Sequence, residues 1–382
     1  MAEQAKVPSI RFAGFTDPWE QRKLGEFGSV AMCKRIYKEQ TSEQGDVPFF
    51  KIGTFGADPD AFISNELFED YKRTYPYPTP GTLLISAAGS IGRIVEYQGE
   101  KAYFQDSNIV WLEHEHRLND AFLKPLYSKI EWGLEGSTIK RLYNKDLLSA
   151  EVTIPDGREQ KEIGQFFAKL DDLITLHQRK YDKLTKVKKA MLEKMFPENG
   201  SPYPEIRFKG FTDAWEQRKL GDIASDMVAG GDIDKDLILA EGQYPVIANA
   251  LTGDGIVGYY DKEYRVNAPA VTVTGRGDVG HAKARLVNFT PVVRLLSVKS
   301  EHDVFFLENV INTLKIVIES TGVPQLTVPQ LAKYEVAFPR QLDEEEHIGA
   351  FFKQLDHLIT LHQRKLEKLK NIKKACLEKM FV

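Results

Sequence analysis

The chain has 382 residues, 42% of them hydrophobic and 28% charged, and a formal net charge of −4 at pH 7. This charge balance argues against a uniformly basic nucleic-acid binder. No apolar run of 18 residues and no leader segment is evident, so we expect a soluble, cytoplasmic protein without membrane contact and with two domains.

The first pattern along the chain is a lead-in segment that occurs twice. Residues 10–27 read IRFAGFTDPWEQRKLGEF and residues 206–223 read IRFKGFTDAWEQRKLGDI, with 14 of 18 positions identical. We predict that the shared WEQRKLG motif forms a strand or turn that closes each domain, with its tryptophan packed into the core.

The segments that follow the lead-ins are β-rich and have diverged from one another. Compact strands are predicted at 82–86 and 270–274, each followed by a glycine-containing turn. The second turn spells GxGxxG at 275–280, but no helix pattern follows it, which favours a structural turn over a dinucleotide site. Two cysteines, Cys33 and Cys376, are too few for a disulfide framework or a zinc cluster. With no other catalytic motif in the chain, we expect a protein that is not an enzyme and binds no cofactor or metal itself.

Two long helices are the strongest prediction. Residues 163–196 and 348–381 share 24 of 34 positions and keep an apolar a/d pattern, so we expect an antiparallel coiled coil. A histidine interrupts each copy at the matching place, either as a tolerated polar residue or as one that sets the register. The predicted seam residues are Phe167, Leu170, Ile174, His177, Tyr181, Leu184, Met191, Phe352, Leu355, Ile359, His362, Leu366, Leu369 and Cys376.

The helix starts also carry a signal. Asp156 and Asp343 stand three residues before Glu159 and Glu346, a spacing that predicts an N-cap with a reciprocal glutamate. A helix of roughly 38 residues measures about 55 Å, which is too long for an ordinary globular helix. The predicted fold class is α+β with an internal pseudo-two-fold repeat. The predicted boundaries are 1–158 for the first β-rich domain, 159–196 for the central helix, 197–343 for the second domain and 344–382 for the C-terminal helix.

This order of domain, helix, domain and helix resembles the specificity (S) subunit of type I restriction–modification systems. The resemblance covers essentially the whole chain and rests on the WEQRKLG lead-ins, the LITLHQRK helices at 173–180 and 358–365, and strand-turn segments such as 272–280. It implies two target-recognition domains that each read one half of a gapped, bipartite DNA sequence, with paired helices that set the gap. It also implies double-stranded DNA, two methyltransferase (M) subunits and two restriction (R) subunits as partners, with S-adenosylmethionine, ATP and Mg on those partners.

Polar side chains on the loops are the candidates for contact with base edges, because such contacts need hydrogen-bonding groups that reach a groove. In the first domain they are Ser86, Ser90, Arg93, Gln105, Ser107, Asn108, Lys140, Arg141 and Asn144. In the second they are Asn249, Thr274, Arg276, His281, Lys283, Arg285, Gln325 and Thr327. The alternative interpretation is a coiled-coil scaffold that assembles partners without reading DNA; it explains the helices but requires no pair of divergent β-rich domains.

Overall fold

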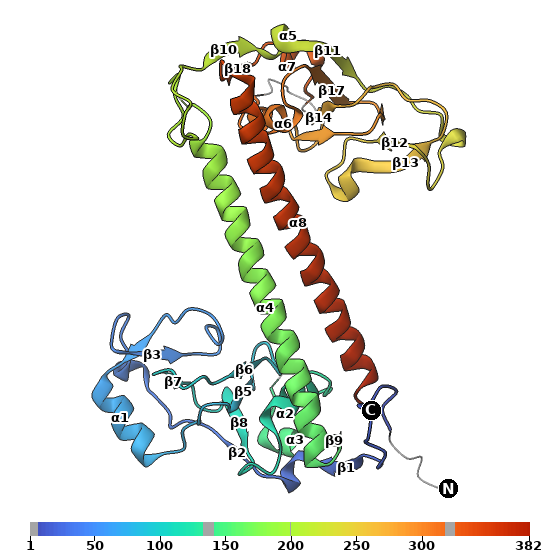
Figure 1. Ribbon diagram of the computed structural model, residues 1–382. Coiled ribbons are helices and arrows are strands. Elements are labelled where there is room, and N and C mark those ends of the chain that lie inside the picture. Colours follow the sequence, from blue (N-terminus) through green and yellow to red (C-terminus); the bar gives the residue numbers. More distant parts are fainter. Residues whose placement is uncertain (1–6, 133–140, 199, 318–324) are drawn as a thin grey trace. The chain divides into compact units, whose positions relative to one another are not determined.

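The computed structural model describes residues 7–132, 141–198, 200–317 and 325–382 (Figure 1). The chain divides into two compact units. Unit 1 comprises residues 1–176 and 365–382, and unit 2 comprises residues 177–364. Each unit therefore contains one β-rich domain together with part of both long helices.

Unit 1 contains two small sheets and a two-stranded ribbon. The sheets have the strand orders β2-β8-β5-β6 and β4-β3-β7, and the ribbon pairs β1 with β9. The elements are β1 (Glu20–Lys23), β2 (Ser29–Ala31), β3 (Val47–Phe50), β4 (Phe62–Ile63), α1 (Asn65–Thr74), β5 (Leu83–Ser86), β6 (Ile94–Glu96), β7 (Tyr103–Phe104), β8 (Ile109–Glu113), α2 (Asp120–Tyr127), α3 (Asn144–Ser149), β9 (Glu151–Ile154) and the start of α4 (Gly157–Lys194).

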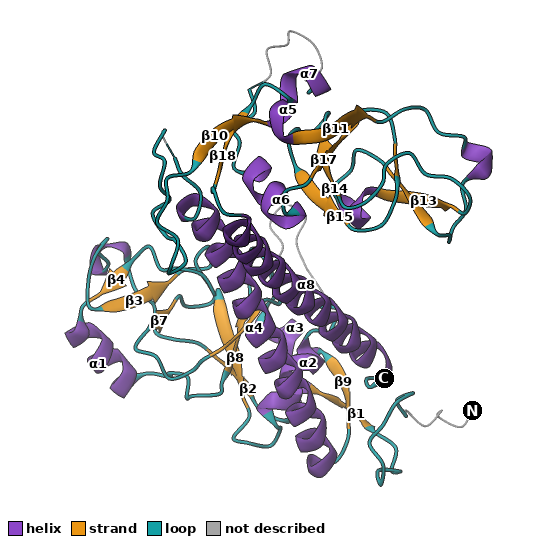
Figure 2. Cartoon of the chain, turned by 45° about the horizontal axis from the view of Figure 1, so that its top comes forward, coloured by secondary structure: helices purple, strands orange, loops and turns teal. Residues whose placement is uncertain are grey.

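Unit 2 repeats this plan. Its sheets have the orders β11-β17-β14-β15 and β13-β12-β16. Its ribbon pairs β10 with β18, as Figure 2 shows. The elements are β10 (Glu216–Lys219), α5 (Leu220–Ile223), β11 (Ala224–Ala229), β12 (Tyr244–Ile247), β13 (Ile256–Tyr260), β14 (Ala270–Thr274), β15 (Ala282–Arg285), β16 (Thr290–Pro291), β17 (Leu295–Ser300), α6 (Val304–Asn312), α7 (Val328–Leu331), β18 (Glu335–Phe338) and α8 (Leu342–Lys379). The α+β class and the internal repeat expected from the sequence are confirmed.

The lead-in motif closes each domain as a strand. β1 pairs antiparallel with β9, and β10 pairs in the same way with β18. Trp19 and Trp215, just before these strands, are each 4% exposed and pack edge-on against Phe381 and Phe196 respectively. The predicted packing of both tryptophans into the core is confirmed.

Helices α4 and α8 have 38 residues each and pack antiparallel within each unit. In unit 1 the Nζ of Lys373 lies 2.5 Å from Asp171 Oδ1, and in unit 2 the Nζ of Lys188 lies 2.6 Å from Asp356 Oδ1. These two ion pairs are equivalent under the 185-residue repeat. Both pairs are half-buried beside the seam, and they fix the same alignment of the helices in both units.

The seam positions face inward along both helices. Each of the fourteen predicted seam side chains is buried or half-buried, whereas Leu173 and Leu176, between seam positions, are 43% and 46% exposed. His177 and His362 lie opposite each other, with 2.8 Å between their Nδ1 atoms. A hydrogen bond at this distance requires one ring to donate and the other to accept, so the two interruptions of the apolar pattern satisfy each other.

The two helix starts differ, and one part of the cap prediction is wrong. Asp156 Oδ1 accepts hydrogen bonds from the backbone N–H groups of Arg158 and Glu159, at 2.7 and 3.0 Å, which confirms the first N-cap. Asp343, however, lies inside α8, where its carbonyl accepts from the His347 ring. The repeat aligns Asp156 with Gln341, so the second Asp–Glu spacing was a coincidence of sequence and not a cap.

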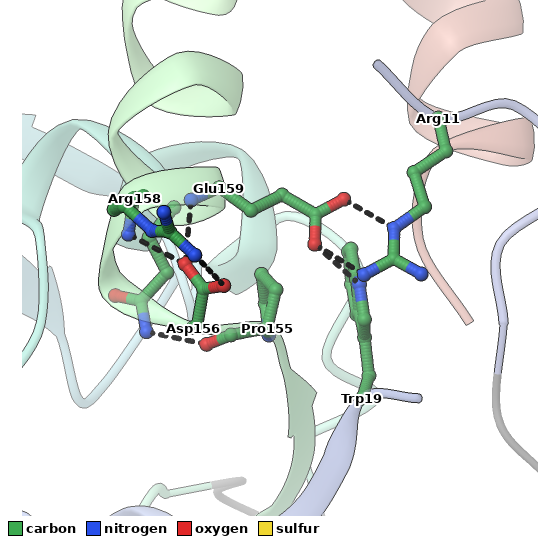
Figure 3. Close-up of polar contacts among 7 residues, drawn as sticks. Arg11, Trp19, Pro155, Asp156, Arg158 and Glu159 are labelled. Atoms are coloured by element: carbon green, nitrogen blue, oxygen red, sulfur yellow. Dashed lines mark hydrogen bonds and ion pairs between the residues drawn. The ribbon is translucent and has the colours of Figure 1, made fainter. Parts of the chain in front are cut away.

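The glutamate predicted to complete the first cap, Glu159, makes a different contact from the one expected. Glu159 is fully buried and accepts from Arg11 Nε and Nη2, at 2.6 and 2.7 Å, and from Trp19 Nε1 at 3.1 Å (Figure 3). Its twin Glu344 accepts from Arg207 Nε and Nη2 at 2.6 and 2.8 Å. Each lead-in is therefore clamped to the first turn of a long helix by a bidentate, charge-assisted pair.

The lead-ins also meet the far ends of the helices. The backbone N–H of Ile10 donates to the carbonyl of Lys379 in unit 1, and that of Ile206 donates to Lys194 in unit 2, both at 2.9 Å. In the described ranges, no helix is both long enough and apolar enough to cross a membrane.

Candidate nucleic-acid interface

The strand-turn segments after β5 and β14 are built alike. The Ser86 hydroxyl donates to the carbonyl of Ser90 and accepts from the backbone N–H of Arg93. In the second domain Thr274 Oγ1 donates to the carbonyl of Asp278 and accepts from the N–H of His281. Both hydroxyl side chains are buried, at 1% and 5% exposed, and are engaged in holding their turns.

These hydrogen bonds show that the GxGxxG segment is a structural turn between two strands. β14 continues through the turn into antiparallel β15, with no helix after the glycines, which confirms the structural interpretation. Gly277 and Gly280 have φ values of 78° and 89°, a left-handed conformation that favours glycine. Gly89 and Gly92 of the first domain share it, at 64° and 78°.

Several candidates in the first domain come together beside this turn. Arg141 Nη2 donates to Ser107 Oγ at 2.9 Å. At the start of the turn, the backbone N–H of Ala87 donates to the carbonyl of Asn108 at 2.7 Å. Gln105 is held by the N–H of Ile52, which donates to its Oε1 at 3.1 Å. The segments around 87, 107 and 141 thus meet at one end of the sheet.

The remaining first-domain candidates are more accessible. Ser90, Arg93 and Asn144 are exposed, and Arg93 Nη2 donates to the carbonyl of Gly56 at 3.3 Å. Lys140 lies outside the described residues. Ser90, Arg93 and Asn144 therefore have the exposure that a groove contact needs, whereas Ser86 does not.

In the second domain, two candidates hold backbone in place. Asn249 Oδ1 accepts from the N–H groups of Gly275 and Arg276, at 2.7 and 3.3 Å, and its Nδ2 donates to the carbonyl of Arg276. Thr327 precedes α7 and hydrogen-bonds to Gln330, its Oγ1 lying 2.8 Å from Gln330 Oε1. Arg276 also forms an isolated bridge with Gln325, as Ala88 does with Arg141 in the first domain.

The other three candidates line a cavity, which we call the β15 cavity. Lys283 and Arg285 alternate along β15 and so project from one face of the sheet, and His281 immediately precedes this strand. The cavity has a volume of about 140 Å³. Its lining comprises Ala248, Ala250, Leu251, Asp254, Thr272, Thr274, His281, Lys283, Arg285 and Leu295.

The cavity is rich in hydrogen-bond donors and positive charge. Burial lowers the pKa of the Arg285 guanidinium, and the negative charges of Asp254 and Glu308 partly offset this decrease. Partial burial also lowers the pKa of His281, and the positive charges of Lys283, Lys188 and Arg285 lower it further, against the opposing effect of Asp278. A neutral His281 beside two cations is the form these surroundings favour.

The buried carboxyl group of Glu308 lies on α6 near this cluster. It is 6% exposed, and burial raises its pKa, while Lys283 and Lys188 act in the opposite direction. Asp254 lines the cavity as well, with its Oδ1 3.9 Å from Lys283 Nζ. Sequence reasoning missed Thr272, Asp254 and Glu308; only Thr272 left a signal, because it alternates with Thr274 along β14.

No group of three or more His, Cys, Asp or Glu side chains that could hold a metal ion occurs among the residues the structure describes. The geometry in both domains is that of loops and strand ends carrying hydrogen-bonding side chains. Such surfaces can bind a polar, hydrogen-bonding ligand without chemical conversion of it.

Comparison with known proteins gives consistent results. The family model described as "Type I restriction modification DNA specificity domain" matches residues 16–186 and 212–371. The chain is 51% identical over 153 residues to a protein of Haemophilus influenzae provisionally named a type I restriction enzyme specificity subunit, a match that covers 40% of each chain. It is 31% identical over 137 residues to a provisionally named type I specificity subunit of Mycoplasma pneumoniae, covering 35% of this chain and 37% of that one. The matched part spans about two fifths of each of these relatives.

The fold has a counterpart among solved structures. The crystal structure of the S subunit of a type I restriction–modification system from M. genitalium matches with a TM-score of 0.73. The match covers 98% of this chain and 99% of that chain, at 16% sequence identity. At this identity the likeness concerns the fold.

Proposed function

The chain belongs to the type I restriction–modification DNA specificity family, and from that membership we propose that it is the non-catalytic subunit that selects the DNA sequence for a methyltransferase. Each β-rich domain would read one half of a gapped, bipartite target. The methyltransferase subunits would carry S-adenosylmethionine, and restriction subunits with ATP and Mg would act only in the full complex.

The observation that carries this proposal is that the two domains share one fold but carry different polar side chains beside the same turn. Both domains have the same sheet orders and the same hydroxyl-held turn, yet the exposed and half-buried polar groups beside the turn differ between them. A reader of two different half-sites needs a shared scaffold and separate contact residues. A scaffold protein that reads no DNA has no need of this divergence.

The long helices would supply the other two parts of the function. Their equal lengths of 38 residues would set the spacing of the half-sites. The exposed Leu173 and Leu176 on α4 would contribute to docking of a methyltransferase subunit, since exposed leucines in a repeated segment suit a protein contact.

An exchange of one domain tests the proposal. Residues 25–158 would be replaced by the corresponding domain of another member of the family, and the methylated sequence mapped with the methyltransferase present. We expect one half of the target to change while the other half and the spacing stay the same. A change in both halves, or in neither, would contradict the assignment of one half-site to each domain.

Helix length provides a second, independent test. Removal of matched heptads from α4 and α8 keeps the a/d seam in register. Both half-sites should persist with a shorter gap between them. An unchanged gap in a folded, active variant would show that the helices do not set the spacing.

A further inference from the structure

The strands around the β15 cavity have counterparts in the first domain, but the side chains at the matching positions differ. The matching hydrogen bonds of Ser86 and Thr274 align β5 with β14 and β6 with β15 at a shift of 188 residues. Lys283 and Arg285 thereby correspond to Val95 and Tyr97. Two charged side chains of the second domain stand where the first domain has apolar and aromatic ones.

In the first domain these positions belong to a closed core. Leu84, Tyr97 and Trp111 are at most 3% exposed and pack in one hydrophobic cluster, with Val95 against it. The cluster that corresponds to it in unit 2 is much smaller, with Ile247, Val266, Ala270, Phe289 and Leu295 as its buried members.

In the second domain polar groups replace that core. Thr272 corresponds to Leu84, and Ser297, opposite Thr272 on β17, takes the place of Trp111. Ser297 is 2% exposed, and its hydroxyl has no hydrogen-bond partner among the described residues. Because a buried polar group without a partner is costly, a fold keeps a polar cavity only where something else compensates for it.

Arg285 is the central group of the cavity. Its Nε donates to Thr272 Oγ1 at 3.0 Å, and the Thr272 hydroxyl itself donates to the carbonyl of Lys283 at 3.2 Å. This chain of hydrogen bonds orients the guanidinium plane. In the part of the chain that the structure describes, no carboxylate forms an ion pair with Arg285, so the two Nη groups remain for a ligand.

We propose that the β15 cavity receives the major-groove edge of a guanine, with Arg285 as the side chain that determines this base in the half-site read by the second domain. The inference rests on the proposed function. Guanine presents two acceptors, N7 and O6, side by side in the major groove, and the forked guanidinium matches both. Lys283 adds a second positive charge to the lining.

A backbone phosphate also offers acceptors, but the observations favour the base. Phosphate contacts in protein–DNA complexes come from many side chains and need no oriented, recessed group. Arg285 is half-buried, and the hydrogen bond from its Nε to Thr272 Oγ1 fixes its orientation. A recessed, oriented fork is the arrangement that reads a base edge.

Selection from a random pool of duplex DNA tests this inference. The complex of the chain with its methyltransferase partner would be used as wild type, as Arg285→Ala and as Arg285→Lys. We expect both variants to lose a guanine preference at one position of one half-site, with the other half-site unchanged. Affinity for the wild-type sequence should fall roughly 5- to 150-fold for Arg285→Ala. Arg285→Lys should keep the salt dependence of binding, because it keeps the charge but not the fork.

Lys209→Ala is the matched control for loss of one positive charge, because the first lead-in carries alanine at the corresponding position, Ala13. It should leave the selected sequence unchanged. Thermal unfolding of each variant would verify that the fold is retained, and Arg285→Lys serves if Arg285→Ala unfolds.

The outcomes distinguish a failure of the proposed function from a failure of the guanine contact assigned to Arg285. A wild-type complex that selects no sequence would refute the proposed function and this inference with it. If the wild type selects a bipartite sequence and the Arg285 variants select the same one with equal affinity, only the inference fails. A uniform loss of affinity on all sequences, with a shallower salt dependence for Arg285→Ala, would assign Arg285 to a phosphate and overturn the guanine contact.

Discussion

The two tryptophans of the lead-ins offer a matched test of the clamp between lead-in and helix. Both are 4% exposed and have similar aromatic neighbours, so Trp→Phe removes nearly the same buried area at each. Trp19 Nε1 donates to the buried Glu159 carboxylate at 3.1 Å, whereas Trp215 Nε1 has no partner among the described residues. A hydrogen bond to a charged group contributes about 1.5–3 kcal/mol. We therefore expect Trp19→Phe to destabilise unit 1 by about that much more than Trp215→Phe destabilises unit 2.

Hydrogen exchange measured peptide by peptide is the suitable assay, because the chain has two units and its global unfolding need not be two-state. Protection of β1 and β9 reports on unit 1, and protection of β10 and β18 reports on unit 2. The difference between the two variants is the quantity that matters, since the lost packing cancels. Equal losses in the two units would refute the role given to the Trp19–Glu159 hydrogen bond.

Three further predictions concern unit 1. Asp156→Ala should reduce the free energy of unfolding by about 1 kcal/mol and lower the Tm by roughly 2–4 °C at neutral pH. Backbone N–H donation from Glu159 lowers the pKa of Asp156, so this contribution is complete above the ordinary carboxyl pKa of about 4 and is lost as the pH falls through the lowered value. Wild type and variant should therefore converge in urea titrations at low pH. Gly164→Ala should destabilise the unit, although alanine is the better helix former by about 1 kcal/mol, because a Cβ there would lie 2.8 Å from the backbone nitrogen of Phe122; a raised Tm would show that helix propensity prevails. Lysine at both Leu173 and Leu176 should abolish co-purification with the methyltransferase while leaving the Tm within about 2 °C, and retained binding would exclude this surface as the docking site.

Repetition made the architecture predictable from the sequence. The two shared segments identified the long helices and the closing strands, and the a/d spacing separated inward positions such as Ile174 from the outward Leu173. Local chemistry was enough for the cap at Asp156. It failed at Asp343, because an acidic residue three positions before a glutamate is common inside an acidic first turn, and only the 185-residue alignment identifies Gln341 as the matching position.

Long-range pairing lay beyond the sequence. Arg11 and Glu159 are 148 positions apart, and no periodicity connects them. Among the candidate contact residues, polar type alone could not distinguish Ser86, which turns inward to hold its own loop, from exposed Ser90. The alternation of polar residues on β15 was visible, but the cavity it lines depends on which strand lies beside it.

The measurement that tests the central claim most directly is methylation-sensitive long-read sequencing of genomic DNA from cells with and without this gene, with the methyltransferase subunit present in both. The proposed function predicts that a gapped, two-part methyladenine motif disappears when the gene is removed. An unchanged methylome, with the protein folded and the methyltransferase active, would contradict it and favour the scaffold interpretation.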